Sequence, residues 1–181
     1  MRRFIITGTP GSGKTAIIRQ LELEGFSVVE EAATAVIAAA QACGTAAPWT
    51  DRTFIDSIVL LQKQRQIRAS KQFEDLQFHD RSAVCTAALA QYLGYPYSFA
   101  LTEELERIKA NEIYEKRVFF IRNLGFITSS DARKISFEEA LRFERIHEET
   151  YRSFGFELLP VEPSGLLDRV NRIRATVFKA S

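Results

Sequence analysis

Residues that form disulfides and metal sites are scarce in this sequence. Among its 181 residues there are two cysteines, Cys43 and Cys85, and two histidines, His79 and His147. Neither pair has the spacing of a metal site, and two cysteines in a chain of this length do not make a disulfide framework. We therefore expect both cysteines to be small buried side chains. His147 is flanked by charged residues, which predicts a place on a charged helix face.

Long apolar runs and a strong net charge are also missing. No stretch approaches the roughly 20 apolar residues that cross a bilayer, and the apolar run near the N-terminus is too short for a secretory signal. The formal net charge is +1, so no global field draws the chain to nucleic acid or to anionic membranes. We expect residues 1–181 to form one cytoplasmic domain with no nucleic-acid or membrane partner.

Apolar segments of strand length alternate with segments of helical spacing. Strands are predicted at residues 3–7, 27–29, 76–79, 117–121 and 156–161. Helices are predicted at residues 14–24, 32–44, 51–73, 82–92, 136–155 and from residues 102 and 164 onward. Thr102 is the expected N-cap of its helix, and Ser136 with Glu139 forms a capping box. The alternation predicts the α/β class, a parallel sheet with helices on both faces.

The segment after the first predicted strand matches the phosphate-loop pattern G-x-x-x-x-G-K-[ST] at every fixed position. It consists of Gly8, Thr9, Pro10, Gly11, Ser12, Gly13, Lys14 and Thr15. Glycines let the backbone turn its amides inward around phosphate oxygens, and the helix N-terminus adds its positive dipole end. Lys14 would reach the β- and γ-phosphates, and the Thr15 hydroxyl would bind magnesium. The segment predicts a nucleoside triphosphate with Mg²⁺, but it does not specify a reaction.

Charged residues follow two of the predicted strands, where ligands gather in sheets of this class. Asp80 would hold magnesium there, directly or through water, and Arg81 would clamp a phosphate or carboxylate. An ordinary Asp-Arg surface turn that caps the next helix explains the same spacing. Glu30 or Glu31 would act as a general base, although acids are favoured at any helix N-terminus.

A polar loop follows the fourth predicted strand. It carries Arg122, Arg133 and Lys134, and cations on a mobile flap can close over a triphosphate. Basic residues are also common in exposed loops without such a role. Of the loop residues, we expect Arg133 rather than Lys134 to close over the triphosphate.

Three segments carry a family resemblance: residues 8–15, residues 29–33 and residues 80–82. They resemble small AAA-type P-loop predicted ATPases grouped with the nicotinamide riboside kinase domain, within the wider nucleoside and nucleotide kinase superfamily. The resemblance implies a three-layer α/β/α fold with a five-stranded parallel sheet of order 2-3-1-4-5, and a lid at about residues 122–136.

The resemblance also implies roles for individual residues. Asp80 and Arg81 would line the acceptor side, and Arg133 would belong to the lid. The carboxylate after the second strand would be the base, by position Glu30 or Glu31, of which we prefer Glu31. The loop after the last strand, with Glu162 and Pro163, would contact the nucleobase.

Two functions from different classes fit these features. The first is a small-molecule kinase that transfers the γ-phosphoryl group of ATP to an unidentified hydroxyl or phosphate acceptor. The second is a regulatory ATPase or GTPase-type switch that acts through a protein partner. The acidic pair and the Asp-Arg pair favour the kinase, because a switch needs no acceptor chemistry. The guanine-specifying motif Asn-Lys-x-Asp is absent, which favours ATP without excluding GTP.

Overall fold

A five-stranded parallel sheet forms the centre of the molecule. The computed structural model describes residues 1–8, 11–72, 74–124 and 137–179. The strands are β1 (Arg2–Gly8), β2 (Ser27–Val29), β3 (Leu76–Asp80), β4 (Arg117–Ile121) and β5 (Glu157–Val161). Their order in the sheet is β2-β3-β1-β4-β5, and each neighbouring pair is parallel. The predicted fold class and strand order are therefore confirmed.

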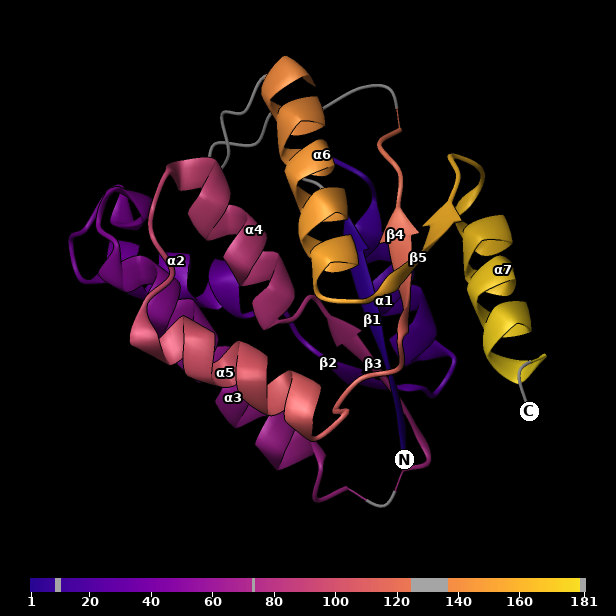
Figure 1. The fold of residues 1–181 in the computed structure, drawn as a ribbon. Helices are drawn as coiled ribbons and strands as arrows, with labels where there is room; N and C mark the ends of the chain where they lie inside the picture. The colour runs from indigo at the N-terminus through magenta and orange to yellow at the C-terminus, as the bar shows by residue number, and fades with distance from the viewer. Residues whose placement is uncertain (9–10, 73, 125–136, 180–181) are drawn as a thin grey trace.

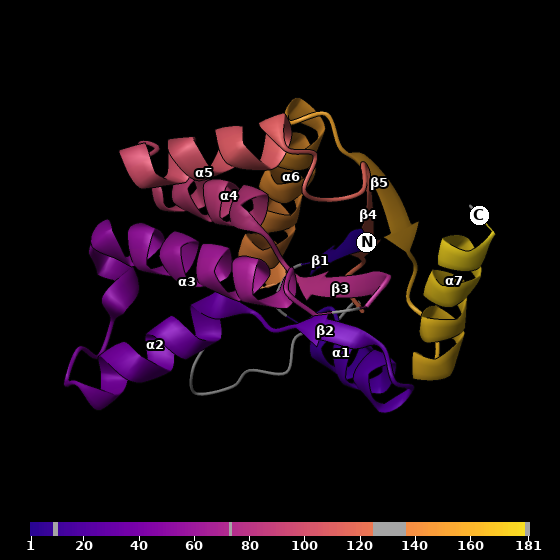
Figure 2. The same cartoon turned by 90° about the horizontal axis from the view of Figure 1, so that it is seen from below.

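Helices cover both faces of the sheet, giving three layers (Figures 1 and 2). They are α1 (Lys14–Leu23), α2 (Ala32–Ala42), α3 (Thr53–Ala69), α4 (Ala83–Leu93), α5 (Phe99–Ala110), α6 (Phe137–Ser153) and α7 (Leu166–Phe178), with a short 3-10 turn at Pro48–Thr50. In Figure 2, α1 and α7 lie on one side of the strands, and α3, α4, α5 and α6 lie on the other.

Side-chain alternation along β1 divides the core between these two layers. Phe4 and Ile6 pack with α1 and α7, whereas Ile5 packs with α3, α4 and α5. All three side chains are fully buried. A parallel strand covered on both faces needs apolar residues at successive positions, which explains its continuous apolar run. Burial of each such side chain contributes roughly 1.5–3 kcal/mol.

The strand register places the predicted functional segments at one edge. Ile6 of β1 is aligned with Asp80 of β3, and Gly8 is aligned with Ile121 of β4. On the other side of β3, Val29 of β2 is aligned with His79. Since the strands are parallel, the chain leaves β1, β2 and β3 at the same edge. The phosphate loop, the acidic pair and the Asp-Arg pair therefore follow adjacent strand ends.

Helix α5 begins before the position that the sequence predicts. Helix α5 begins at Phe99, and the Ser98 Oγ accepts a hydrogen bond from the Leu101 amide at 3.1 Å. Ser98 is thus the N-cap, and the prediction of Thr102 as the cap was wrong. The Thr102 hydroxyl instead donates to the Ser98 carbonyl at 2.9 Å, a bond within the first helical turn. The predicted capping residue Ser136 lies outside the described residues.

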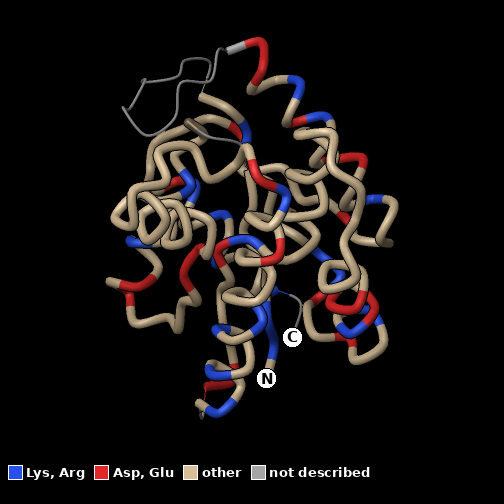
Figure 3. Tube along the Cα trace, turned by 90° about the vertical axis from the view of Figure 1, so that its left-hand side faces the viewer, with Lys and Arg blue, Asp and Glu red and all other residues tan. Residues whose placement is uncertain are grey.

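Charges are spread over the molecule rather than gathered in one block. Figure 3 shows basic and acidic residues interspersed along the trace. Among the helices in the described part of the chain, none has both the length and the apolarity needed to cross a membrane.

Candidate functional site

The phosphate loop joins the end of β1 to the first turn of α1. A Cβ atom at Gly8 would lie 2.5 Å from the Ile121 carbonyl oxygen, so this approach of β1 to β4 requires glycine. Thr9 and Pro10 lie outside the described residues. Gly11 and the N-cap residue Gly13 both have left-handed backbone, with φ of 82° and 77°. Among the described residues, no backbone carbonyl accepts from the amides of residues 11–15, and a glycine-rich turn before a helix N-terminus is a backbone arrangement that binds anions.

Lys14 and Asp80 form a buried ion pair beside this loop. The Lys14 Nζ donates to Asp80 Oδ1, and the two side chains are 5% and 8% exposed. Burial lowers the pKa of Lys14 and the nearby Arg81 cation adds to the effect, while Asp80 and Glu31 oppose it. Thr15, one residue further along α1, is exposed to solvent. The structure thus brings together the predicted phosphate-binding lysine and the predicted metal ligand on β3.

Arg81 and Glu31 form a second ion pair at the same edge. Arg81 Nε lies 2.7 Å from Glu31 Oε1, and the arginine side chain is 7% exposed. Burial of this kind does not fit a surface turn, the alternative explanation of the Asp-Arg spacing. Glu30 is 55% exposed and pairs with Arg19 on the surface. Of the two acids that the sequence leaves open, only Glu31 therefore lies in the described cluster.

The backbone at Arg81 is in an uncommon conformation for a side chain of this size. Its φ is +70°, in the left-handed region, and its amide donates to the Ile6 carbonyl at 3.0 Å. Non-glycine residues are held in this region only where the surroundings over-determine them, and such residues cluster at functional sites. The turn after β3 directs the guanidinium inward, toward Glu31 and helix α4.

Cys85 and His147 also belong to this cluster, although the sequence predicted no functional role for either. Cys85 Sγ lies 3.0 Å from Arg81 Nη1 and 2.8 Å from His147 Nε2. His147 is fully buried between α6 and α4, so its predicted place on a charged helix face was wrong. The expected burial holds for Cys85, but Cys43 is exposed. Arg81 precedes helix α4, so helical spacing does not predict its contact with Cys85, and nothing in the sequence links His147 to either.

Arg169 of α7 donates a hydrogen bond to the backbone of the phosphate loop. Its Nη1 donates to the Ser12 carbonyl at 2.9 Å, and the side chain is 5% exposed. Its guanidinium lies about where a side chain at Gly13 would project, with 3.0 Å from Nη2 to a Cβ built there. Sequence reasoning missed Arg169 because it is 157 residues away from Ser12.

The remaining predicted site residues are less closely tied to this cluster. Glu162 and Pro163 are exposed and directly follow β5. Arg122 is hydrogen-bonded to Glu144 and Glu148 of α6. Of the predicted lid at residues 122–136, only residues 122–124 are described, and Arg133 and Lys134 lie outside the described residues.

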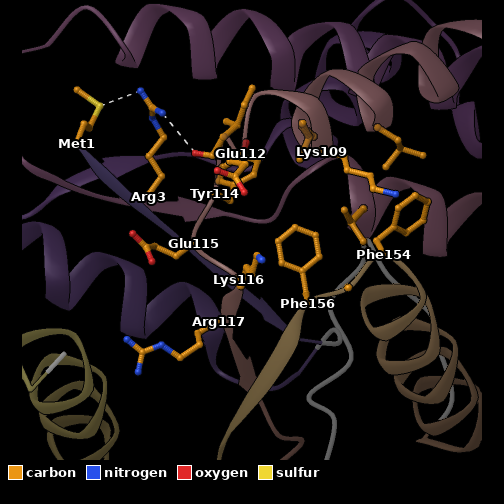
Figure 4. Close-up of a pocket in the computed structure, with 15 residues that line it drawn as sticks. Met1, Arg3, Lys109, Glu112, Tyr114, Glu115, Lys116, Arg117, Phe154 and Phe156 are labelled. Carbon is orange, nitrogen blue, oxygen red and sulfur yellow. Dashed lines mark hydrogen bonds between the residues drawn. The ribbon is translucent and has the colours of Figure 1, made fainter.

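A cavity of about 670 Å³ opens at the opposite edge, where the strands begin (Figure 4). Figure 4 shows the aromatic ring of Phe156 beside Lys116, with Arg3 held by hydrogen bonds to Met1 and to the backbone. Because these residues precede or begin the strands, the length of the sheet separates this cavity from the phosphate loop. The two features are distinct parts of the molecule.

Known proteins resemble this chain in fold and in family. A family model described as an AAA domain matches residues 3–169. A search of curated protein sequences found no match. Among solved structures, deoxyadenosine kinase from M. mycoides with the products dCMP and a flexible dCDP aligns with a TM-score of 0.65 and 13% identity, covering 98% of this chain and 99% of that one.

Two other structures of that kinase are also similar. The dCTP-bound form has a TM-score of 0.58 and 16% identity over 99% of this chain and 100% of the other. The dATP-bound form has a TM-score of 0.56 and 12% identity over 97% and 98%. At these identities the likeness is one of fold. The family match over residues 3–169 shows that the chain belongs to the AAA domain family, and the structural likeness shows that it has a P-loop nucleotide-kinase-like fold.

Proposed function

We propose that this protein binds ATP with Mg²⁺ and transfers the γ-phosphoryl group to a small-molecule acceptor. One observation carries the proposal: the pairs Lys14–Asp80 and Glu31–Arg81 are buried together at the strand ends beside the phosphate loop. A phosphate loop alone serves any triphosphate-binding protein. A carboxylate and an arginine next to it supply the acceptor-side chemistry of a transferase.

Nucleotide binding requires Lys14 to exchange partners. In the structure its ammonium is paired with Asp80. A triphosphate bound to the loop amides and the N-terminus of α1 offers a larger negative charge within reach of the same side chain. Lys14 then moves its hydrogen bonds to the phosphate oxygens, which frees the Asp80 carboxylate.

The freed carboxylate and the exposed Thr15 hydroxyl are the groups that would hold magnesium. Proteins bind Mg²⁺ through few side chains, and phosphate oxygens and water complete its octahedral shell. When bound, the ion supplies charge neutralisation at the β- and γ-phosphates. The oxygen ligands available here fit that requirement, since the Asp80 carboxylate lies at Lys14 and the Thr15 hydroxyl belongs to the next residue of the loop.

Glu31 and Arg81 serve the acceptor. The Arg81 guanidinium favours the ionised form of the Glu31 carboxylate, which accepts the proton of the attacking hydroxyl. The bond between the acceptor oxygen and the γ-phosphorus forms as the bond from that phosphorus to the β–γ bridging oxygen breaks. The similar kinase structures hold deoxynucleotides, so deoxynucleosides are the first acceptors to test.

The test measures ADP release with a panel of deoxynucleosides, deoxynucleotides and other hydroxyl metabolites. Replacing Glu31 with Gln is expected to leave the Kd for ATP unchanged and to lower kcat by about 10²–10⁴, the usual contribution of a general base. The matched Glu30→Gln variant, which alters the neighbouring exposed acid, is expected to retain the wild-type rate. A Glu31→Gln enzyme at the wild-type rate removes Glu31 as the base. If no acceptor raises ADP release above the intrinsic rate, the kinase proposal fails and the nucleotide switch replaces it.

A further inference from the structure

A buried cluster between α4 and α6 contains groups that the proposed transfer does not use. The Cys85 sulfur accepts a hydrogen bond from Arg81 Nη1 at 3.0 Å and lies 2.8 Å from His147 Nε2. Cys85 is 5% exposed and His147 is fully buried. A thiol and an imidazole within hydrogen-bonding distance form one coupled unit, in which the charge of each depends on the other and on the fixed positive charge of the guanidinium.

The hydrogen bonds restrict where the protons lie. His147 Nδ1 is 3.1 Å from the Phe143 carbonyl oxygen, which can only accept, so Nδ1 carries a proton. The second ring nitrogen, Nε2, faces the Cys85 sulfur. One proton is therefore shared between these two atoms: it is either on a neutral thiol, or on an imidazolium that donates to a thiolate.

The charges around the sulfur favour the thiolate. Arg81 is a cation that faces it from the turn before α4, and Glu31 lies beyond that guanidinium. From α6, the Tyr151 hydroxyl is hydrogen-bonded to Ser82 Oγ at 3.0 Å, and burial and the sulfur raise the pKa of this tyrosine, so it stays neutral.

The other helices against α4 bring apolar side chains to the same core, among them Ile55 and Val59 of α3 and Leu101 of α5. Burial by itself raises the pKa of the Cys85 thiol. The Arg81 guanidinium and the His147 imidazole outweigh it and lower that pKa to about 6.

We infer that Cys85 and His147 form a thiolate–imidazolium pair that positions the Arg81 guanidinium for the acceptor. Glu31 holds Arg81 at Nε and the Cys85 sulfur holds it at Nη1. A guanidinium has five N–H donors, and Nη1 is the one that donates to the sulfur, so the geometry leaves further donors for a ligand. Cys85 and His147 are positioning residues, since they act through Arg81. The role in turnover rests on the proposed kinase function, whereas the ionised pair does not depend on it.

The first test measures the ionisation of Cys85 in the nucleotide-free protein. Because the chain has two cysteines, Cys43→Ser leaves Cys85 as the sole thiol without touching the cluster. Thiolate ultraviolet absorbance is followed against pH, with circular dichroism to verify folding. The expected midpoint lies about one to three pH units below the ordinary thiol value of about 8.5. A sulfur that stays protonated up to the ordinary value overturns the inference.

The second test asks whether His147 carries the matching proton. Nitrogen-15 NMR of the Cys43→Ser protein is expected to show His147 protonated on both ring nitrogens at pH 7. His79 is an internal reference, because burial and the Arg3 charge lower its pKa to about 3 and keep it neutral. Adding Cys85→Ser is expected to convert His147 to the neutral form. A neutral His147 with Cys85 present overturns the pair.

The third test separates charge from packing through enzyme kinetics. Cys85→Ser keeps a small polar side chain without the charge, and Cys85→Asp restores a negative charge. Cys85→Ser is expected to raise the acceptor KM by about tenfold or more, the usual worth of a charge-assisted hydrogen bond, with ATP affinity unchanged. Cys85→Asp is expected to recover part of that loss. If Cys85→Ser and Cys85→Asp both fold and lose equal activity, the result contradicts the positioning role. If no acceptor is phosphorylated at all, the kinase proposal fails, while the absorbance and NMR measurements still decide the pair.

Discussion

The Lys14–Asp80 ion pair allows a quantitative test of the site without nucleotide. Both side chains are more than nine-tenths buried, so removal of one leaves the other as an uncompensated charge. We consider Lys14→Ala, Asp80→Ala and the double variant, each unfolded in urea at pH 7. Breaking a buried pair in this way costs about 3–5 kcal/mol.

The two single variants differ in how the remaining charge is relieved. In Lys14→Ala, the Arg81 cation still lies near the Asp80 carboxylate, so we expect a loss near the lower limit, about 3 kcal/mol. In Asp80→Ala, Lys14 is left beside Arg81 and loses its proton instead. Removing that proton costs about 1.4 kcal/mol for each pH unit below the ordinary lysine pKa of about 10.4. At pH 7 this limits the loss of stability to roughly 4–5 kcal/mol.

The double variant removes both charges and therefore costs less than the sum of the single changes. We expect a coupling energy of about 2 kcal/mol or more. The matched control is the Arg19–Glu22 pair on the same helix, with a distance of 2.8 Å and side chains 56% and 50% exposed, for which coupling stays below about 1 kcal/mol. Additive effects at Lys14 and Asp80, within about 0.5 kcal/mol, would refute a buried pair.

Three further predictions concern acid stability and the phosphate loop. Burial holds the folded-state pKa of His79 at about 3, below the unfolded value of about 6.5, so the unfolded chain gains a proton first as the pH falls. The free energy of unfolding should decrease by up to about 1.4 kcal/mol per pH unit between those values, and His79→Gln should flatten that slope in urea titrations. Gly8→Ala forces a shift of the Ile121 carbonyl, so it should lower the free energy of unfolding by about 1–3 kcal/mol and remove the stabilisation that ATP provides, both followed by thermal unfolding. An unchanged melting temperature contradicts the close approach. Arg169→Ala removes the donor to the Ser12 carbonyl and should weaken ATP binding by about three- to tenfold in calorimetry, whereas equal affinity means that the loop needs no such support.

Local patterns in the sequence carried the architecture and the phosphate loop. Apolar runs that end in glycine or a charged residue predicted the strands and the position at which each one ends. A parallel strand that is buried on both faces needs such a continuous apolar run. The Gly8–Lys14 spacing is local in the same sense, since adjacent residues form the loop. The strand order came from family resemblance, and the observed sheet confirms it.

Individual side-chain partners depended on tertiary structure. Sequence alone left Glu30 and Glu31 equivalent by position, and the packing of β2 beside β3 brings only Glu31 to Arg81. The N-cap of α5 fell to Ser98 rather than Thr102, because both residues have capping side chains and the local pattern cannot rank them.

The contact of Cys85 with His147 joins positions 62 residues apart, and that of Arg169 with Ser12 joins positions 157 apart. By itself the sequence determined which segments form strands, helices and the phosphate loop, since hydrophobic period and glycine placement are properties of neighbouring residues. The packing of α6 and α7 against the sheet decided which charged and polar groups meet, because the partners of a buried group are set by distances that sequence spacing does not encode.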